Sequence, residues 1–264
     1  MSAAAVLSEV DDCGVAWLSL NRPEVNNAYN GDLIEQLAQA MESYATDSAV
    51  RLVVIRGNGR HFQAGADLQW LDQVGRADAE ENLRVSRQTA MAMHGLNNYP
   101  KPTLALVQGG CFGGGIGLIA SCDVVLAESS ARFAITEARW GLIASIIIPQ
   151  LNATIGPRQV RRYALSCEIF DAQRALQMGL VHEVCEPGQL QESAAVVIDH
   201  LLKSAPDALT QTKQIALRDA GLDVGGEAFE AMIRAHALKR RSEESMEGLA
   251  SFREKRDPNW YRPV

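Results

Sequence analysis

The sequence lacks the features of several broad classes of protein. Its 264 residues contain five scattered cysteines without Cys-x-x-Cys spacing, so neither a disulfide framework nor a zinc site is expected. No apolar run is long enough to span a bilayer and no signal-type leader opens the chain, so we expect a soluble cytoplasmic protein. Acidic residues outnumber basic ones by 32 to 25, which gives no support to nucleic acid or an anionic membrane as a partner. No metal-ligand cluster and no nicotinamide fingerprint occurs, so we expect no metal and no bound cofactor.

The chain does contain an alternation of short apolar runs and amphipathic segments. Apolar runs predict strands at 6–10, 15–20, 52–55, 103–107, 123–127 and 181–184. Helical spacing predicts helices at 31–45, 67–75, 78–96, 158–165, 171–178, 189–203, 205–218, 227–239 and 243–255. Buried strands separated by helices indicate the α/β class, with a more helical composition after about residue 200.

The stretch most suited to chemistry is a strand at 103–107 followed by a run of glycines between Gly109 and Gly117. Glycine lets the backbone adopt positive φ and approach a ligand closely. A helix that opens near Gly114 would direct unpaired N–H groups at an anion, either a bound one or one that forms during reaction. A tight turn in which glycine only relieves crowding is the alternative interpretation.

A second strand, at 52–57, leads into a similar turn between His61 and Leu68, with Asp67 as a candidate N-cap. Two such strand–turn–helix units can supply two backbone N–H groups that converge on one oxygen. The segments 62–68 and 109–115 resemble the two oxyanion-hole motifs of the crotonase (enoyl-CoA hydratase/isomerase) superfamily. The resemblance continues, in the same order, at 20–28, 133–142 and 247–256.

This resemblance implies a fold, a site and an assembly. The expected fold is an α/β spiral of repeated ββα units over residues 1–200, with a C-terminal helical segment, 201–264, for trimerisation and active-site cover. The expected assembly is a homotrimer or a dimer of trimers. By resemblance, the amides of Ala66 and Gly114 form the oxyanion hole and Glu137 is the acid/base. The residues implied in binding an acyl-CoA, which enters as substrate, are Arg22, Val25, Ala64, Asp67, Leu68, Gly113 and Lys255, with Arg256 as a further phosphate ligand.

Residue-based reasoning leaves the role of Glu137 open. A carboxylate in an apolar stretch has its pKa raised toward the range useful for proton transfer. An ion pair with Arg139 or Arg132 is the structural alternative.

The chain also departs from the family's pattern. Two-glutamate hydratases carry their other carboxylate at the position of Gly117, and glycine cannot activate water. Three readings follow: a hydratase that uses Glu137 alone, an isomerase that moves a double bond between the 3- and 2-positions, or a non-catalytic RNA-binding or scaffold protein. The negative charge and the two intact oxyanion motifs favour an enzyme.

The motifs around Gly117 and Glu137 are most similar to hydratases of 3-substituted glutaconyl-CoAs, such as 3-methylglutaconyl-CoA and isohexenylglutaconyl-CoA. The unusual apolar run Ile143–Pro149 is expected to line the acyl pocket, which favours the longer, terpene-derived group. Such substrates carry a second carboxylate, and Arg139, His61 and Asn98 are candidate partners for it.

Overall fold

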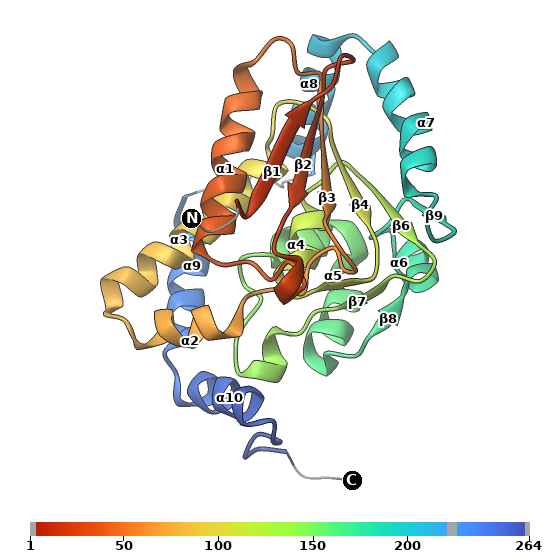
Figure 1. Cartoon of the computed structure of the whole chain (residues 1–264). Coiled ribbons are helices and arrows are strands. Elements are labelled where there is room, and N and C mark those ends of the chain that lie inside the picture. The colour runs from red at the N-terminus through yellow and green to blue at the C-terminus, as the bar shows by residue number, and fades with distance from the viewer. Residues whose placement is uncertain (1–3, 221–225, 262–264) are drawn as a thin grey trace.

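The computed structural model describes residues 4–220 and 226–261, and its centre is a six-stranded sheet (Figure 1). In order across the sheet, the strands are β1 (Val6–Val10), β2 (Val15–Leu20), β3 (Leu52–Gly57), β4 (Thr103–Val107), β6 (Val124–Glu128) and β9 (Glu183–Cys185). β1 and β2 pair antiparallel, and all later neighbours pair parallel. All six predicted strands are confirmed, with small differences at their ends.

The helices also follow the prediction closely. They are α1 (Gly31–Thr46), α2 (Leu68–Arg76), α3 (Ala79–Asn97), α4 (Gly114–Ala120), α5 (Ile148–Ser166), α6 (Ala172–Met178), α7 (Leu190–Lys203), α8 (Pro206–Asp219), α9 (Gly226–Arg240) and α10 (Glu243–Glu254). Short 3-10 helices occupy Pro23–Val25 (η1) and Glu137–Trp140 (η2). α5 consists of two helices joined by a kink at Gly156, whose φ is 75°. The predicted helix at 158–165 corresponds to the second of them, and the first, which begins at Ile148, was not predicted.

The central sheet is covered on both faces, which explains the continuous apolar runs of its strands. Alternate residues of β2 to β4 contribute to two separate clusters. On one face Leu18, Ile55 and Ala105 belong to the main core, which also contains side chains of α1, α3 and α4. On the other face Trp17, Val54 and their neighbours pack against α7.

A second, small sheet extends the chain's repeated strand–strand–helix pattern. Its strands are β5 (Gly110–Phe112), β7 (Arg132–Ala134) and β8 (Phe170–Asp171). β5 lies inside the glycine run, between β4 and α4 in the chain. It pairs parallel with β7. The sequence did not predict β5, because glycine disfavours strands and hides the alternation of a three-residue strand.

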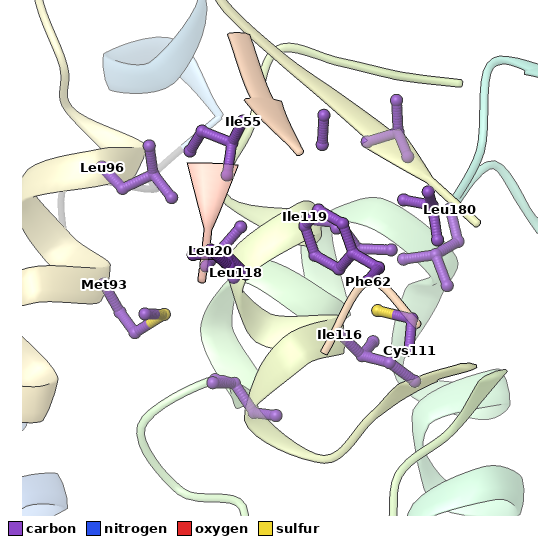
Figure 2. Close-up of a cluster of buried hydrophobic side chains, with 14 of the residues drawn as sticks. Leu20, Ile55, Phe62, Met93, Leu96, Cys111, Ile116, Leu118, Ile119 and Leu180 are labelled. Carbon is purple, nitrogen blue, oxygen red and sulfur yellow. The ribbon is translucent and has the colours of Figure 1, made fainter. Parts of the chain in front are cut away.

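The main core surrounds α4 (Figure 2). Ile116, Leu118 and Ile119 of this helix are buried among Phe62 and side chains from the sheet and from α3. Cys111 belongs to the same cluster, and burial raises the pKa of its thiol well above the usual value. Packing in the main core therefore holds the glycine-rich turn and the start of α4 in place.

The C-terminal segment packs against the rest of the chain through several of its helices. Lys213 of α8 forms an ion pair with Asp123 at 2.7 Å. α9 packs along α3, and α10 lies at the lower end of the molecule beside α2 and η2 (Figure 1). Its proposed part in oligomerisation stays a prediction. In the ranges 4–220 and 226–261, no helix has the length and apolar character needed to cross a membrane.

Candidate active site

A cavity of about 510 Å³ lies between the two glycine turns, α1, α3 and the C-terminal helices. Ala66, Gly114 and Glu137, the three residues predicted to carry the reaction, all line it. Much of the remaining wall is apolar and comes from α1 and from the segment after η2: Leu33, Ile34, Leu37, Leu142, Ile143, Ile146 and Ile147. The size and the mainly apolar wall are typical of a small-molecule site.

The hydrogen bonds of the turn around Ala66 leave the backbone N–H of this residue without an acceptor. The N–H of Tyr29 donates to the carbonyl of Gly65 at 2.8 Å, and the carbonyl of Tyr29 accepts from the N–H of Asp67 at 2.9 Å. In this parallel bridge, the N–H of the residue between Gly65 and Asp67 points away from Tyr29. No group in the described part of the chain accepts from it.

The second free amide belongs to Gly114, the first residue of α4, where a helix has no acceptor of its own to offer. The preceding residue, Gly113, has a φ of 51°, which favours glycine. A Cβ at position 114 would lie 2.5 Å from Cε1 of Tyr29. Glycine is thus needed here for the close approach of the Tyr29 ring.

Direct hydrogen bonds hold the two turns side by side. The N–H of Gln63 donates to the carbonyl of Gly110 at 3.1 Å, and the N–H of Phe112 donates to the carbonyl of Gln63 at 2.9 Å. A Cβ on Gly65 would lie 3.0 Å from the carbonyl oxygen of Phe112. The free amides of Ala66 and Gly114 therefore face one cavity from two fixed turns, an arrangement that suits a developing oxyanion.

Glu137 begins η2 at the wall of this cavity, and its side chain lies against Gly113. Its buried Oε2 has no hydrogen-bond partner. Burial raises the pKa of this carboxyl group to about 7. Among the described residues neither Arg139 nor Arg132 pairs with it, so the structural ion-pair interpretation is wrong. A carboxyl group in this state can both accept and return a proton near neutral pH.

The side chain of Ile147 occupies the space beside Gly117, where two-glutamate hydratases carry their other carboxylate. A Cβ on Gly117 would lie 2.1 Å from Cγ2 of Ile147 and 2.7 Å from its Cβ. Ile147 belongs to the unusual apolar run, and it lines the cavity together with Ile143, Ala144 and Ile146. The expectation that this run lines the pocket is confirmed. The same run leaves no room for any side chain at position 117.

Five of the residues predicted to bind substrate line the cavity: Val25, Ala64, Asp67, Leu68 and Gly113. Arg22 lies behind Asp67, with its Nη2 at 3.1 Å from the carboxylate, and it also donates to the carbonyl of Ala28. Asp67 in turn caps α2 by accepting from the N–H groups of Gln69 and Trp70. Arg22 thus holds the turn that presents Ala66, and its contact with a CoA phosphate stays a prediction.

The cationic candidates near the C-terminus lie outside the cavity. Lys255 is exposed at the end of α10. Arg256 forms ion pairs with Glu247 at 2.6 Å and with Glu254 at 2.7 Å, so its charge is already matched. A phosphate contact of Lys255 stays a prediction.

None of the candidate partners for a distal carboxylate lines the cavity. Arg139 is exposed, His61 accepts from the N–H of Gly110 through Nδ1, and the amide of Asn98 contacts the ring of His94.

The polar side chains that line the cavity include Tyr29, His236 and Arg240, which sequence reasoning did not identify as site residues. Tyr29 follows the Asn-rich loop, and no local pattern marks it as a site residue. His236 and Arg240 lie in a helix with a basic end, which is typical of a solvated surface helix. Their burial follows from the packing of α9 on α3, which the sequence did not reveal.

The comparisons with known proteins agree with this geometry. The pattern of the "Enoyl-CoA hydratase/isomerase" family matches residues 11–263. The chain is 34% identical over 254 residues to the 2,3-dehydroadipyl-CoA hydratase of Escherichia coli, covering 93% of this chain and 94% of that one. A crystal structure of an enoyl-CoA hydratase from Shewanella pealeana is 34% identical, with a TM-score of 0.79 and coverage of 97% and 96%. The α/β crotonase fold with a helical C-terminal region is thus confirmed, and the chain belongs to the enoyl-CoA hydratase/isomerase family.

Proposed function

We propose that this protein hydrates the 2,3 double bond of a 3-substituted glutaconyl-CoA, with Glu137 as its single acid/base. The observation that carries the proposal is the buried, unpaired carboxyl group of Glu137 in one cavity with the two free amides of Ala66 and Gly114. The large apolar wall supports the isohexenyl group over the smaller 3-methyl group. A relative that is named for a dicarboxylic enoyl-CoA supports a substrate with a second carboxylate.

The two amides would bind the thioester oxygen of the substrate. As a nucleophile adds to C3, negative charge moves onto this oxygen, and the amides stabilise it without moving. Removal of one donor of this kind typically costs about 3 kcal/mol in the transition state.

Glu137 would transfer the proton in both halves of the reaction. Its ionised form takes a proton from water while the water oxygen bonds to C3, and the enolate forms at the thioester. The same carboxyl group then returns the proton to C2. Water is added across the double bond, and Glu137 regains its starting state.

An isomerase is the second candidate, and the packing of Ile147 against Gly117 favours it. This contact removes the carboxylate that helps to hold water in two-glutamate hydratases. A shift of the double bond from the 3- to the 2-position needs only one base, which removes a proton from C2 and returns it to C4.

The absorbance of the conjugated enoyl thioester tests both candidates. Wild-type protein and Glu137→Gln are mixed with crotonyl-, 3-methylglutaconyl- and isohexenylglutaconyl-CoA and with a 3-enoyl-CoA. We expect the absorbance to fall with a glutaconyl-CoA, and the rate to drop by about 10²- to 10⁴-fold in the variant. A rise with the 3-enoyl-CoA alone would establish an isomerase. No change with any substrate would refute both and favour the non-catalytic binder or scaffold.

We also propose that the chain assembles as a homotrimer or a dimer of trimers. The exposed apolar side chains of the C-terminal part support a subunit contact there: Leu238, Met246, Phe252, Trp260 and Tyr261.

A further inference from the structure

Arg240 is a buried cation in the wall of the active-site cavity. Its exposed fraction is 2%, and it lines the cavity together with His236, one turn earlier in α9. The buried residues of this helix, Ile233, Ala237 and Arg240, have the spacing of an inward-facing stripe. Arg240 thus occupies a position that an apolar residue would normally fill.

The hydrogen bonds of Arg240 leave part of its guanidinium free. Nη1 donates to Oδ1 of Asn82 at 2.8 Å and, more weakly, to the carbonyl of Asn82 at 3.4 Å. Nη2 donates to Nδ1 of His236 at 3.1 Å. Nε is buried without a partner. Since a guanidinium carries five N–H donors, two remain open, one of them on Nε.

The surroundings of Arg240 supply no negative charge. Between residues 4–220 and 226–261, no carboxylate lies within ion-pair distance of it, and Asn82 is neutral. His236 is neutral as well, because burial and, secondly, the charge of Arg240 lower its pKa to about 3. Burial lowers the pKa of Arg240 to about 10, so the guanidinium remains charged at neutral pH. A buried charge without a counterion is unfavourable, and an anion of matching shape would relieve it.

Tyr29 relates this cation to the reaction centre. Its ring lies against Gly114, beside the predicted oxyanion hole. The pKa of Tyr29 is raised by burial and by the charge of Glu137, and the charge of Arg240 acts in the opposite direction. Tyr29 is therefore close to both groups, and Tyr29, Glu137 and Arg240 all line the same cavity. Thr89 and Met93 of α3 also line this cavity.

We propose that Arg240 binds a carboxylate at the far end of the acyl chain, so that the cavity selects dicarboxylic acyl-CoAs over monocarboxylic ones. The two open N–H donors of the guanidinium match the two oxygens of a carboxylate. Asn82 and His236 are positioning residues, because they hold the guanidinium by its other donors. The proposal rests on the proposed function only in taking the ligand to be an acyl-CoA.

A purely structural role of Arg240, as a clamp between α9 and α3, makes a different prediction. A clamp would affect charged and neutral acyl groups equally, since its loss loosens the whole wall. A carboxylate receptor discriminates between them. The decisive measurement is therefore the difference in affinity between a dicarboxylic ligand and a neutral ligand of the same chain length.

The experiment measures the dissociation constants of saturated ligands by titration calorimetry. Glutaryl-CoA and adipyl-CoA are compared with pentanoyl-CoA and hexanoyl-CoA on wild type, Arg240→Met, Arg240→Lys and Arg234→Met. Arg234 is the matched control, because it lies on the same helix but is exposed and faces Glu230 at 4.0 Å. Saturated ligands undergo no hydration, so a failure of the proposed reaction does not affect the result.

We expect wild type and Arg234→Met to bind at least one dicarboxylic ligand about tenfold or more tightly than its neutral match. Arg240→Met should lose this preference and still bind the neutral ligands, and Arg240→Lys should keep part of it. Equal affinity for both ligands in wild type would overturn the proposal, whatever the variants do. So would an equal loss of both ligands in a folded Arg240→Met protein. If Arg240→Met does not fold, the wild-type preference and its reduction in Arg240→Lys decide the question.

Discussion

The contact between Gly117 and Ile147 explains why the candidate active site lacks a second carboxylate at position 117, and this steric account can be tested quantitatively. Gly117→Ala adds a methyl carbon at 2.1 Å from Cγ2 of Ile147, far inside normal contact distance. Ile147 is 4% exposed, and its β-branched side chain has little freedom to turn away. The substitution should therefore destabilise the protein.

The expected magnitudes follow from the packing on each side of the contact. Overpacking of a buried site costs about 1–3 kcal/mol, of which the better helix propensity of alanine offsets about 1 kcal/mol. Ile147→Ala removes a buried side chain, at a cost of about 2 kcal/mol or slightly more, since Ile147 already borders a cavity. In the double variant the new methyl group enters the space that Ile147 leaves. The free energy of unfolding of the double variant should then exceed the additive expectation by about 1–2 kcal/mol.

Urea unfolding of wild type, both single variants and the double variant measures this coupling. All four are compared at one protein concentration, because subunit assembly would add to the apparent stability. Independent sites add within about 0.5 kcal/mol. Additivity within that margin, or a Gly117→Ala protein as stable as wild type, would refute the steric account of the missing carboxylate.

Two further predictions concern the reacting groups. Because burial raises the pKa of Glu137 to about 7 and the ionised form must take a proton from water, kcat/KM for hydration should rise about tenfold per pH unit below pH 7 and level off above it. A profile without an inflection between about pH 6 and 8 would contradict this role. Gly114→Ala should lower kcat/KM by about 10²-fold, because its Cβ displaces the Tyr29 ring and disturbs an oxyanion donor. A Gly114→Ala enzyme with unchanged kinetics would show that the amide of residue 114 does not bind the thioester oxygen.

The parts of the site that the sequence predicted are those set by the local backbone. Positive φ at Gly65 and Gly113 leaves a mark in the sequence, since other residues rarely adopt this conformation. The strands before both turns are short apolar runs that are buried on two faces, and these also have a clear pattern. The order strand, glycine turn, helix therefore located the two turns, and the resemblance to the crotonase family then assigned Ala66 and Gly114 within them.

The parts of the site that the sequence did not predict depend on contacts between segments that are distant in the chain. The absence of a carboxylate at Gly117 was visible in the sequence, but its physical cause, the side chain of Ile147, comes from the start of α5. None of the predicted partners of a distal carboxylate, Arg139, His61 and Asn98, lines the cavity. Arg240 belongs to a basic helix end in which Arg241 is exposed, so its burial could not be inferred from its neighbours.

Backbone groups and side chains of the cavity respond differently to substitution. The free amides of Ala66 and Gly114 are backbone groups, so most substitutions that keep the two turns leave them in place. The rest of the cavity wall includes side chains of α1, α3, α9 and the segment after η2, which pack together only in the folded protein. Side chains there can change without disturbing the turns or Glu137. Specificity for a carboxylate therefore needs one buried cation at the α3–α9 contact and neutral groups that orient it, and Arg240 with Asn82 and His236 meets both conditions.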